Sequence, residues 1–96
     1  MKKKELTITN KYGLHSRPAS ELVKVASQYD SEITLSYDGQ EANAKSILGI
    51  MVLAIEPGAE VEIAADGNDE DKALTAIADL INNKFYVEYE DENNRR

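Results

Sequence analysis

The stretch Lys11-Tyr12-Gly13-Leu14-His15-Ser16-Arg17-Pro18-Ala19-Ser20 decides how the fold begins, because a loop ends in it and a helix starts in it. Apolar residues then recur at i, i+3, i+4, i+7 and i+10, the spacing of one helix face, at Ala19, Leu22, Val23, Ala26 and Tyr29. Pro18 suits the first helical turn, since its missing N–H would have no partner there. The spacing predicts a helix that begins beside His15 and runs to about Tyr29.

His15 is the only histidine, and it is predicted to lie at or just before the N-terminus of this helix. Unpaired backbone N–H groups and the positive end of the helix dipole favour an anion at such a place. Neutral imidazole is a nucleophile near neutral pH, and a phosphoryl group that it gained would bring negative charge. The N–H groups of Ser16 and Arg17 could bind the phosphoryl oxygens, and the Arg17 guanidinium could add a charge-assisted hydrogen bond.

Other interpretations of His15 remain open on the residues alone. A lone histidine at a helix start is often a polar cap or a surface residue. A metal site is less favoured, because the chain has one His, no Cys and no second ligand at metal-binding spacing. We therefore expect neither a metal nor a cofactor.

Alternating apolar residues predict four strands, and a further helical pattern follows the last strand. The strands are expected around Leu6 and Ile8 and over 33–37, 41–44 and 61–65, and the last helix has its apolar face at Ala73, Ile77, Leu80 and Ile81. Asp38-Gly39 is typical of a two-residue hairpin turn. Glu56-Pro57-Gly58 suits a type II turn. Asp69 is expected to cap the last helix.

Ser46 precedes an apolar run over 47–54 and is predicted to cap a short helix. Three residues of the run suit a face in the core: Ile50, Leu53 and Ala54. Ile47, Leu48 and Met51 would form a separate, partly exposed patch, which indicates a docking surface; a fully buried connector is the alternative. The predicted partner surface adds two residues of the first helix near His15 and comprises Ser20, Lys24, Ile47, Leu48 and Met51. For Ser20 and Lys24, a solvated helix face gives the same pattern.

Length and composition limit the other possibilities. A chain of 96 residues is expected to form one domain with a modest core. Its formal net charge of −7 argues against a nucleic-acid partner. The longest apolar run is too short to span a membrane, and no signal peptide is expected after the lysine-rich start, since no apolar core follows it. A cytoplasmic protein without membrane insertion is the expectation.

Two motifs resemble those of one known family. The run Gly13-Leu14-His15-Ser16-Arg17-Pro18-Ala19 resembles the active-site motif of HPr, the histidine-containing phosphocarrier family of the phosphoenolpyruvate-dependent sugar phosphotransferase system. The run Lys45-Ser46-Ile47-Leu48-Gly49-Ile50-Met51 resembles the regulatory-serine region of the same family. The resemblance covers about residues 4–84 and has the elements in the same order. Ser16 and Ser20 depart mildly from it, standing where a small residue such as alanine is frequent.

The resemblance implies a fold, a function and partners. The fold is α+β, an open-faced sandwich in which a four-stranded antiparallel sheet has three helices on one face, in the order β-α-β-β-α-β-α. His15 would accept a phosphoryl group from phospho-Enzyme I, assisted by Arg17, and pass it to the A component of a sugar-specific enzyme II. Such a protein is a carrier and not an enzyme. Ser46 would be a regulatory phosphorylation site, with a serine kinase/phosphorylase and a transcriptional regulator as further candidate partners.

Three alternatives stay open: a regulatory binding protein controlled by Ser46, a carrier in a nitrogen-type phosphotransferase branch, and a purely structural interaction domain. We place the phosphocarrier domain at residues 1–84 and a C-terminal extension of unknown role at 85–96. Phe85, Val87 and Tyr89 alternate with polar residues and Tyr86, so this extension could continue the helix, add an edge strand or hang loose.

Overall fold

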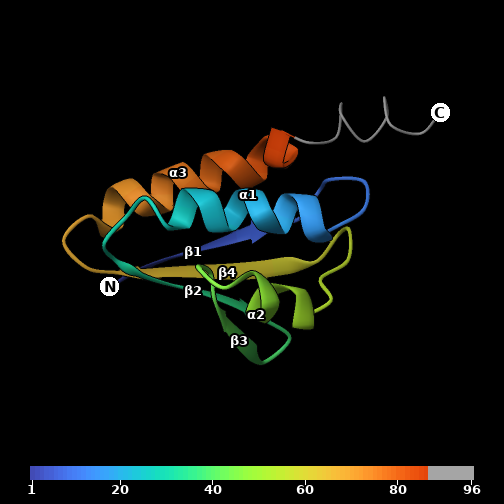
Figure 1. Cartoon of the computed structure of the whole chain (residues 1–96), viewed down its shortest axis with the longest axis horizontal. Coiled ribbons are helices and arrows are strands. Elements are labelled where there is room, and N and C mark those ends of the chain that lie inside the picture. Colours follow the sequence, from blue (N-terminus) through green and yellow to red (C-terminus); the bar gives the residue numbers. More distant parts are fainter. Residues whose placement is uncertain (87–96) are drawn as a thin grey trace.

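A four-stranded antiparallel sheet forms one layer of the molecule (Figure 1). In the computed structural model, which describes residues 1–86, the strands are β1 (Lys2–Thr7), β2 (Glu32–Tyr37), β3 (Gln40–Asn43) and β4 (Glu60–Asp66), in the spatial order β1-β4-β2-β3. Leu6 lies opposite Val61, and Leu35 lies opposite Ile63. All four are buried. Because side chains alternate between the two faces of a strand, this register gives the sheet one apolar face.

Helices cover that apolar face. Helix α1 (Ser16–Ala26) and helix α3 (Glu70–Asn82) lie side by side over the sheet (Figure 1), and the short helix α2 (Ile47–Val52) packs against α1 and β3. The largest side chains of the core come from every layer and include Ile8, Leu22, Ile33, Leu35, Ile50, Ile63, Ile77 and Ile81. The predicted fold class and element order are confirmed. No helix within residues 1–86 is long and apolar enough to cross a membrane.

Both predicted turns are present. Asp38 and Gly39 have φ of 53° and 79° between β2 and β3, as a two-residue primed hairpin requires. Gly58 has φ of 89°, and the Ala59 N–H donates to the Glu56 carbonyl over 3.1 Å, which fits a type II turn.

Two sequence predictions about helix ends are wrong. Helix α1 ends at Ala26 instead of Tyr29. Beyond it, the N–H groups of Gln28 and Tyr29 donate to carbonyls only three residues back, so the chain tightens and leaves the helix. Ala54, expected in the core, is exposed, because the backbone turns to a φ of 51° after α2 ends.

Asp69 stands at the N-cap position of α3, but its side chain has another role. Among the described residues, its carboxylate accepts hydrogen bonds from the N–H groups of Asp30 (2.8 Å) and Ser31 (3.0 Å) and from the Ser31 hydroxyl. The loop between α1 and β2 is thereby attached to the start of α3. These donors, the Ser31 hydroxyl first among them, lower the pKa of Asp69.

The described chain ends in a 3₁₀ turn over Lys84–Tyr86 that packs against α1 and α3. Phe85 is fully buried there, and all three residues have positive φ. The rest of the predicted C-terminal extension, residues 87–96, lies outside the described residues, and so does the alternation expected at Val87 and Tyr89.

Candidate functional site

His15 occupies the N-cap position of α1. Its backbone is extended (φ −77°, ψ −172°), and its carbonyl accepts the Ala19 N–H over 3.0 Å, which starts the helical hydrogen bonding. Within the described residues, the imidazole makes no capping hydrogen bond to the helix. The side chain is half-buried, with Nε2 buried. The imidazole therefore sits at the helix start while the main chain, and not the ring, forms the cap.

Main-chain hydrogen bonds hold the loop before His15 in place. The Ile8 N–H donates to the Ala59 carbonyl (2.8 Å), and the Gly58 N–H donates back to the Ile8 carbonyl (2.7 Å). Nearer the site, the Leu14 N–H donates to the Ile55 carbonyl over 3.0 Å. His15 thus follows a segment attached to the chain between α2 and β4, as expected for a loop that presents a side chain from a rigid base.

Gly13 permits this close approach. Its φ is 71°, and a Cβ on it would lie 2.5 Å from the Ile55 carbonyl oxygen. Only glycine fits both the left-handed backbone and the missing space.

The loop contributes two further residues, Asn10 and Tyr12, neither of which the sequence analysis assigned to the site. The Tyr12 ring meets the His15 ring edge-on, with centroids 5.7 Å apart and planes at 84°. Asn10 is buried, and its Nδ2 donates to the Gly13 carbonyl over 2.6 Å. A signal was present, since Asn at the first and Gly at the fourth position are typical of a β-turn.

Ser16 and Arg17 are the first two residues of α1, and Arg17 is half-buried while Ser16 is exposed. The first turn of α1, which lies wholly in the described part of the chain, carries no acidic side chain. The N-terminal end of the helix dipole and the Arg17 charge therefore act together on the surroundings of His15. Ser20 and Lys24 are exposed farther along α1, where Lys24 Nζ lies 3.3 Å from Glu21 Oε2.

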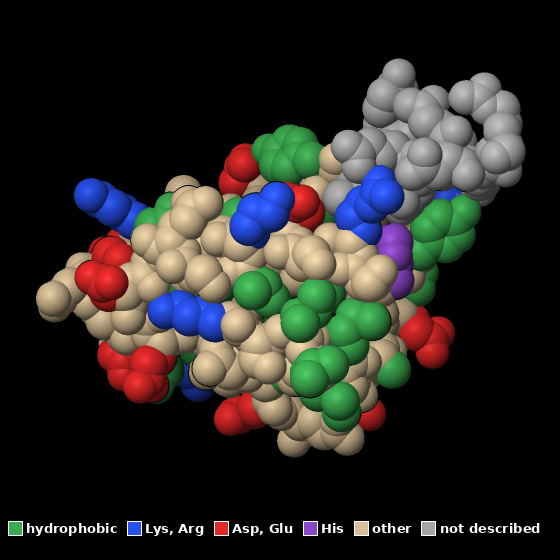
Figure 2. All heavy atoms as spheres, viewed as in Figure 1, with side chains coloured by type: hydrophobic (Ala, Val, Ile, Leu, Met, Phe, Trp, Pro, Cys, Tyr) green, Lys and Arg blue, Asp and Glu red, His purple; other side chains and the backbone are tan. Residues whose placement is uncertain are grey.

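Ser46 caps α2 as predicted, with its Oγ accepting the Gly49 N–H over 3.1 Å. Beyond the cap, Ile50 is buried, whereas Ile47 and Met51 are each 38 % exposed and Leu48 is 76 % exposed. The predicted split of the apolar run is therefore confirmed for these residues. Val52, at 77 % exposure, was not foreseen. Figure 2 shows the hydrophobic side chains gathered over α2, close to the histidine in purple.

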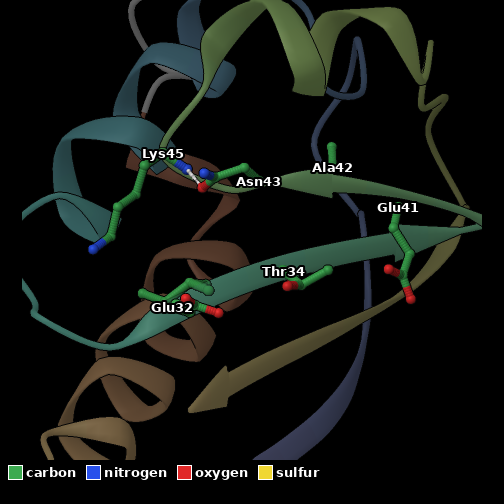
Figure 3. A pocket seen from close by; sticks show the side chains of 7 residues that line it. Glu32, Thr34, Glu41, Ala42, Asn43 and Lys45 are labelled. Carbon is green, nitrogen blue, oxygen red and sulfur yellow. Dashed lines mark hydrogen bonds between the residues drawn. The ribbon is translucent and has the colours of Figure 1, made fainter. Parts of the chain in front are cut away.

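A separate hollow of about 500 Å³ opens at the other side of the sheet, between β2 and β3 (Figure 3). Its polar lining includes Glu32, Thr34, Glu41 and Asn43. Asn43 Oδ1 accepts the Lys45 N–H over 2.8 Å, and Lys45 Nζ donates to the Tyr29 carbonyl over 2.7 Å. The hollow shares no residue with the loop around His15. Residues 1–86 contain no cluster of three or more His, Cys, Asp or Glu side chains able to hold a metal ion.

Comparisons with known proteins agree on one family. Residues 2–83 match the family model described as the PTS HPr component phosphorylation site. The curated phosphocarrier protein HPr of Xylella fastidiosa (strain Temecula1) is 47 % identical over 81 residues, which are 84 % of this chain and 91 % of that protein. A crystal structure of HPr from Thermoanaerobacter tengcongensis superposes with a TM-score of 0.86 at 46 % identity, covering 88 % of this chain and 96 % of that one.

A second kind of relative also superposes on the chain. The crystal structure of Crh, described as the catabolite repression containing protein of Bacillus subtilis, gives a TM-score of 0.70 at 38 % identity, over 88 % of this chain and 97 % of that one.

Proposed function

The chain belongs to the HPr phosphocarrier family of the phosphotransferase system, and we propose that His15 is the residue on which it carries the phosphoryl group. The donor is phospho-Enzyme I, and the acceptor is the A component of a sugar-specific enzyme II. The protein is then a relay with a covalent phosphohistidine intermediate, and it requires no cofactor of its own.

The observation that carries this proposal is the position of His15. The imidazole lies at the N-terminus of an eleven-residue helix without capping it among the described residues, and no acidic side chain stands in the first turn. Phosphoryl oxygens at this place would receive hydrogen bonds from the N–H groups of Ser16 and Arg17 and from the Arg17 guanidinium. The helix dipole contributes about 0.3–1 kcal/mol at an exposed site and ~2 kcal/mol when partly buried. Such modest stabilisation suits a group that must also leave.

The burial of Nε2 favours Nδ1 as the reacting atom. A donor does not reach a buried ring nitrogen, so we assign the attack to Nδ1. Its lone pair forms the new N–P bond while the bond from phosphorus to the donor breaks, and the donor keeps that electron pair. The proton of the neutral ring stays on Nε2. Arg17 and the backbone N–H groups stabilise the negative charge on the three oxygens of the phosphoryl group during transfer.

Incubation with phosphoenolpyruvate, magnesium and Enzyme I tests this role directly. We expect one added phosphate by intact mass, lost in acid and absent in His15→Ala. Addition of an A component should then remove the phosphate. A stable phosphate that persists in His15→Ala would contradict the proposal.

The partner surface that we propose comprises the exposed apolar residues of α2, which are Ile47, Leu48, Met51 and Val52, together with Ser20 and Lys24 on α1. Leu48→Ser should raise the KM for phospho-Enzyme I about tenfold, which corresponds to the loss of one interface anchor that contributes about 1.4 kcal/mol. Its thermal stability should stay near that of the parent because Leu48 is 76 % exposed. Thr75→Ala, at an exposed position of α3, serves as the control, and an equal rise in its KM would show that the effect is not local.

A second function is favoured by the cap position of Ser46 and by the likeness to Crh. Phosphorylation of Ser46 would add about −1.5 to −2 charge beside the partner surface. At a helix start this charge is tolerated, so its effect would fall on the partner interface and not on the fold. The candidate partners of this form are a serine kinase/phosphorylase and a transcriptional regulator. We expect the protein to work in the cytoplasm without membrane insertion, and its formal net charge of −7 disfavours a nucleic-acid partner.

A further inference from the structure

Residues 10–13 form a turn whose ends are joined by two hydrogen bonds. The Gly13 N–H donates to the Asn10 carbonyl over 3.3 Å, and the Asn10 side-chain Nδ2 donates to the Gly13 carbonyl over 2.6 Å. The second hydrogen bond is short and buried, since Asn10 is only 1 % exposed. The side chain of Asn10 therefore fixes the same turn that the main chain has already formed.

Asn10 is an unusual residue to bury here. Its Oδ1 is buried and has no hydrogen-bond partner among the described residues. A buried polar atom left unpaired is destabilising, and an apolar residue of similar size would avoid that cost. The path of the chain at Gly13 is already set by the hydrogen bond from Leu14 to Ile55. The amide is thus not needed to hold the end of the turn against the rest of the molecule.

The turn positions the side chain of Tyr12 beside His15. This side chain is 45 % exposed, and its ring stands edge-on to the His15 ring at 5.7 Å between centroids. The Lys11 ammonium lies over the Tyr12 ring, with Nζ 5.6 Å from the ring centroid. A perpendicular aromatic neighbour at this distance restricts the rotation of the imidazole ring.

We infer that Asn10 and Tyr12 are positioning residues for His15, with Asn10 acting through Tyr12. Asn10 closes the turn, the turn sets the Tyr12 ring, and Tyr12 keeps the imidazole oriented with Nε2 buried and Nδ1 toward a partner. Orientation of the attacking atom governs how often an encounter is productive. The kinetic part of this inference rests on the proposed carrier function, whereas the structural part does not.

The structural part is tested by NMR on the unphosphorylated protein. Replacing Tyr12 by Leu removes its ring current and should shift the His15 Hδ2 and Hε1 resonances. Asn10→Ala should shift them in the same direction, because the ring is released. Asn10→Asp keeps the shape but lacks the amide donor, so it provides a second variant should Asn10→Ala fold poorly. Thr9→Ala, an exposed neighbour in the same loop, is the control and should leave both resonances in place.

The kinetic part is tested by a double-mutant cycle on phosphoryl transfer from phospho-Enzyme I. Asn10→Ala and Tyr12→Leu should each lower kcat, by roughly tenfold, with little change in KM, since orientation and not docking is lost. In the Tyr12→Leu background, Asn10→Ala should add less than about twofold, because the two act as one unit.

Independent effects that multiply in the double variant would overturn the inference, and so would His15 resonances that stay unmoved in Asn10→Ala and Asn10→Asp. A parent protein that accepts no phosphate at all would refute the carrier role alone. The resonance shifts would still decide whether Asn10 and Tyr12 position His15.

Discussion

At the scale of single residues, Gly13 controls how closely the loop before His15 approaches the segment after α2. Replacing Gly13 by Ala should lower the free energy of unfolding by roughly 2–4 kcal/mol, because it adds both left-handed strain and a contact 2.5 Å from the Ile55 carbonyl oxygen. Gly39→Ala is the matched control, since Gly39 also has positive φ but has no atom within 4 Å of a Cβ. Gly39→Ala should lower the free energy of unfolding, measured in urea, by about 1 kcal/mol. Equal losses in the two variants would show that the close approach is unimportant.

Prediction from the sequence was least complete for single residues of the site. His15 and Ser46 could be found because each precedes a helical pattern, and a helix start fixes its own geometry. Asn10 and Gly13 carried the signal of a β-turn, but the position of this turn beside His15 and the direction of the Tyr12 ring could not be predicted, since they depend on hydrogen bonds to distant segments, here from Leu14 to Ile55. Val52 was missed because a six-residue helix gives too few turns to define its exposed face.

At the scale of elements, α2 joins a structural cap to an exposed apolar surface. Ser46→Ala removes the oxygen that accepts the Gly49 N–H and should lower the free energy of unfolding by about 1 kcal/mol. Ser46→Asp keeps an acceptor at the N-cap and should remain close to the parent in stability. Urea unfolding of the three proteins checks this order.

The same two variants separate stability from regulation. Ser46→Asp should slow phosphate uptake from phospho-Enzyme I in a time course by intact mass, since the added charge lies beside Leu48 and Ile47. Ser46→Ala should accept phosphate at the parental rate in spite of its lower stability. If Ser46→Asp is also as fast as the parent, the charge mechanism is wrong or Asp imitates phosphoserine poorly.

The order of the elements could be predicted because the patterns are strong. Apolar and polar residues alternate clearly over 33–37 and 61–65, and apolar residues recur at the helical period over 70–82. Element ends could not. Helix α1 stops at Ala26 although the apolar spacing continues to Tyr29, because the chain must turn there to meet Asp69. Ala54 leaves the core for a comparable reason, as the backbone reverses after α2.

At the scale of the whole molecule, Asp69 attaches the loop after α1 to the start of α3, two elements about forty residues apart in sequence. Hydrogen bonds from Ser31 and Asp30 lower the pKa of Asp69 in the folded state. A carboxyl with a lowered folded pKa stabilises the protein above its unfolded pKa, and this stabilisation is lost as the pH falls through the folded value.

Asp69→Asn should therefore be less stable than the parent at neutral pH, and the difference should shrink as the pH falls below about 4. Urea unfolding at a series of pH values measures this difference. Glu41→Gln, an exposed residue of the edge strand β3, is the control and should track the parent throughout. A gap between Asp69→Asn and the parent that stays constant with pH would mean that the charge of Asp69 is not involved.

We propose that Nδ1 of His15, at the start of α1, carries the phosphoryl group. A long-range ¹H–¹⁵N correlation spectrum of the ¹⁵N-labelled protein, recorded before and after treatment with phosphoenolpyruvate and Enzyme I, tests it most directly. The Nδ1 resonance of His15 should move and couple to phosphorus while Nε2 keeps its proton. Phosphorus coupling at Nε2, or a phosphorylated protein with an unchanged His15 ring, would contradict it.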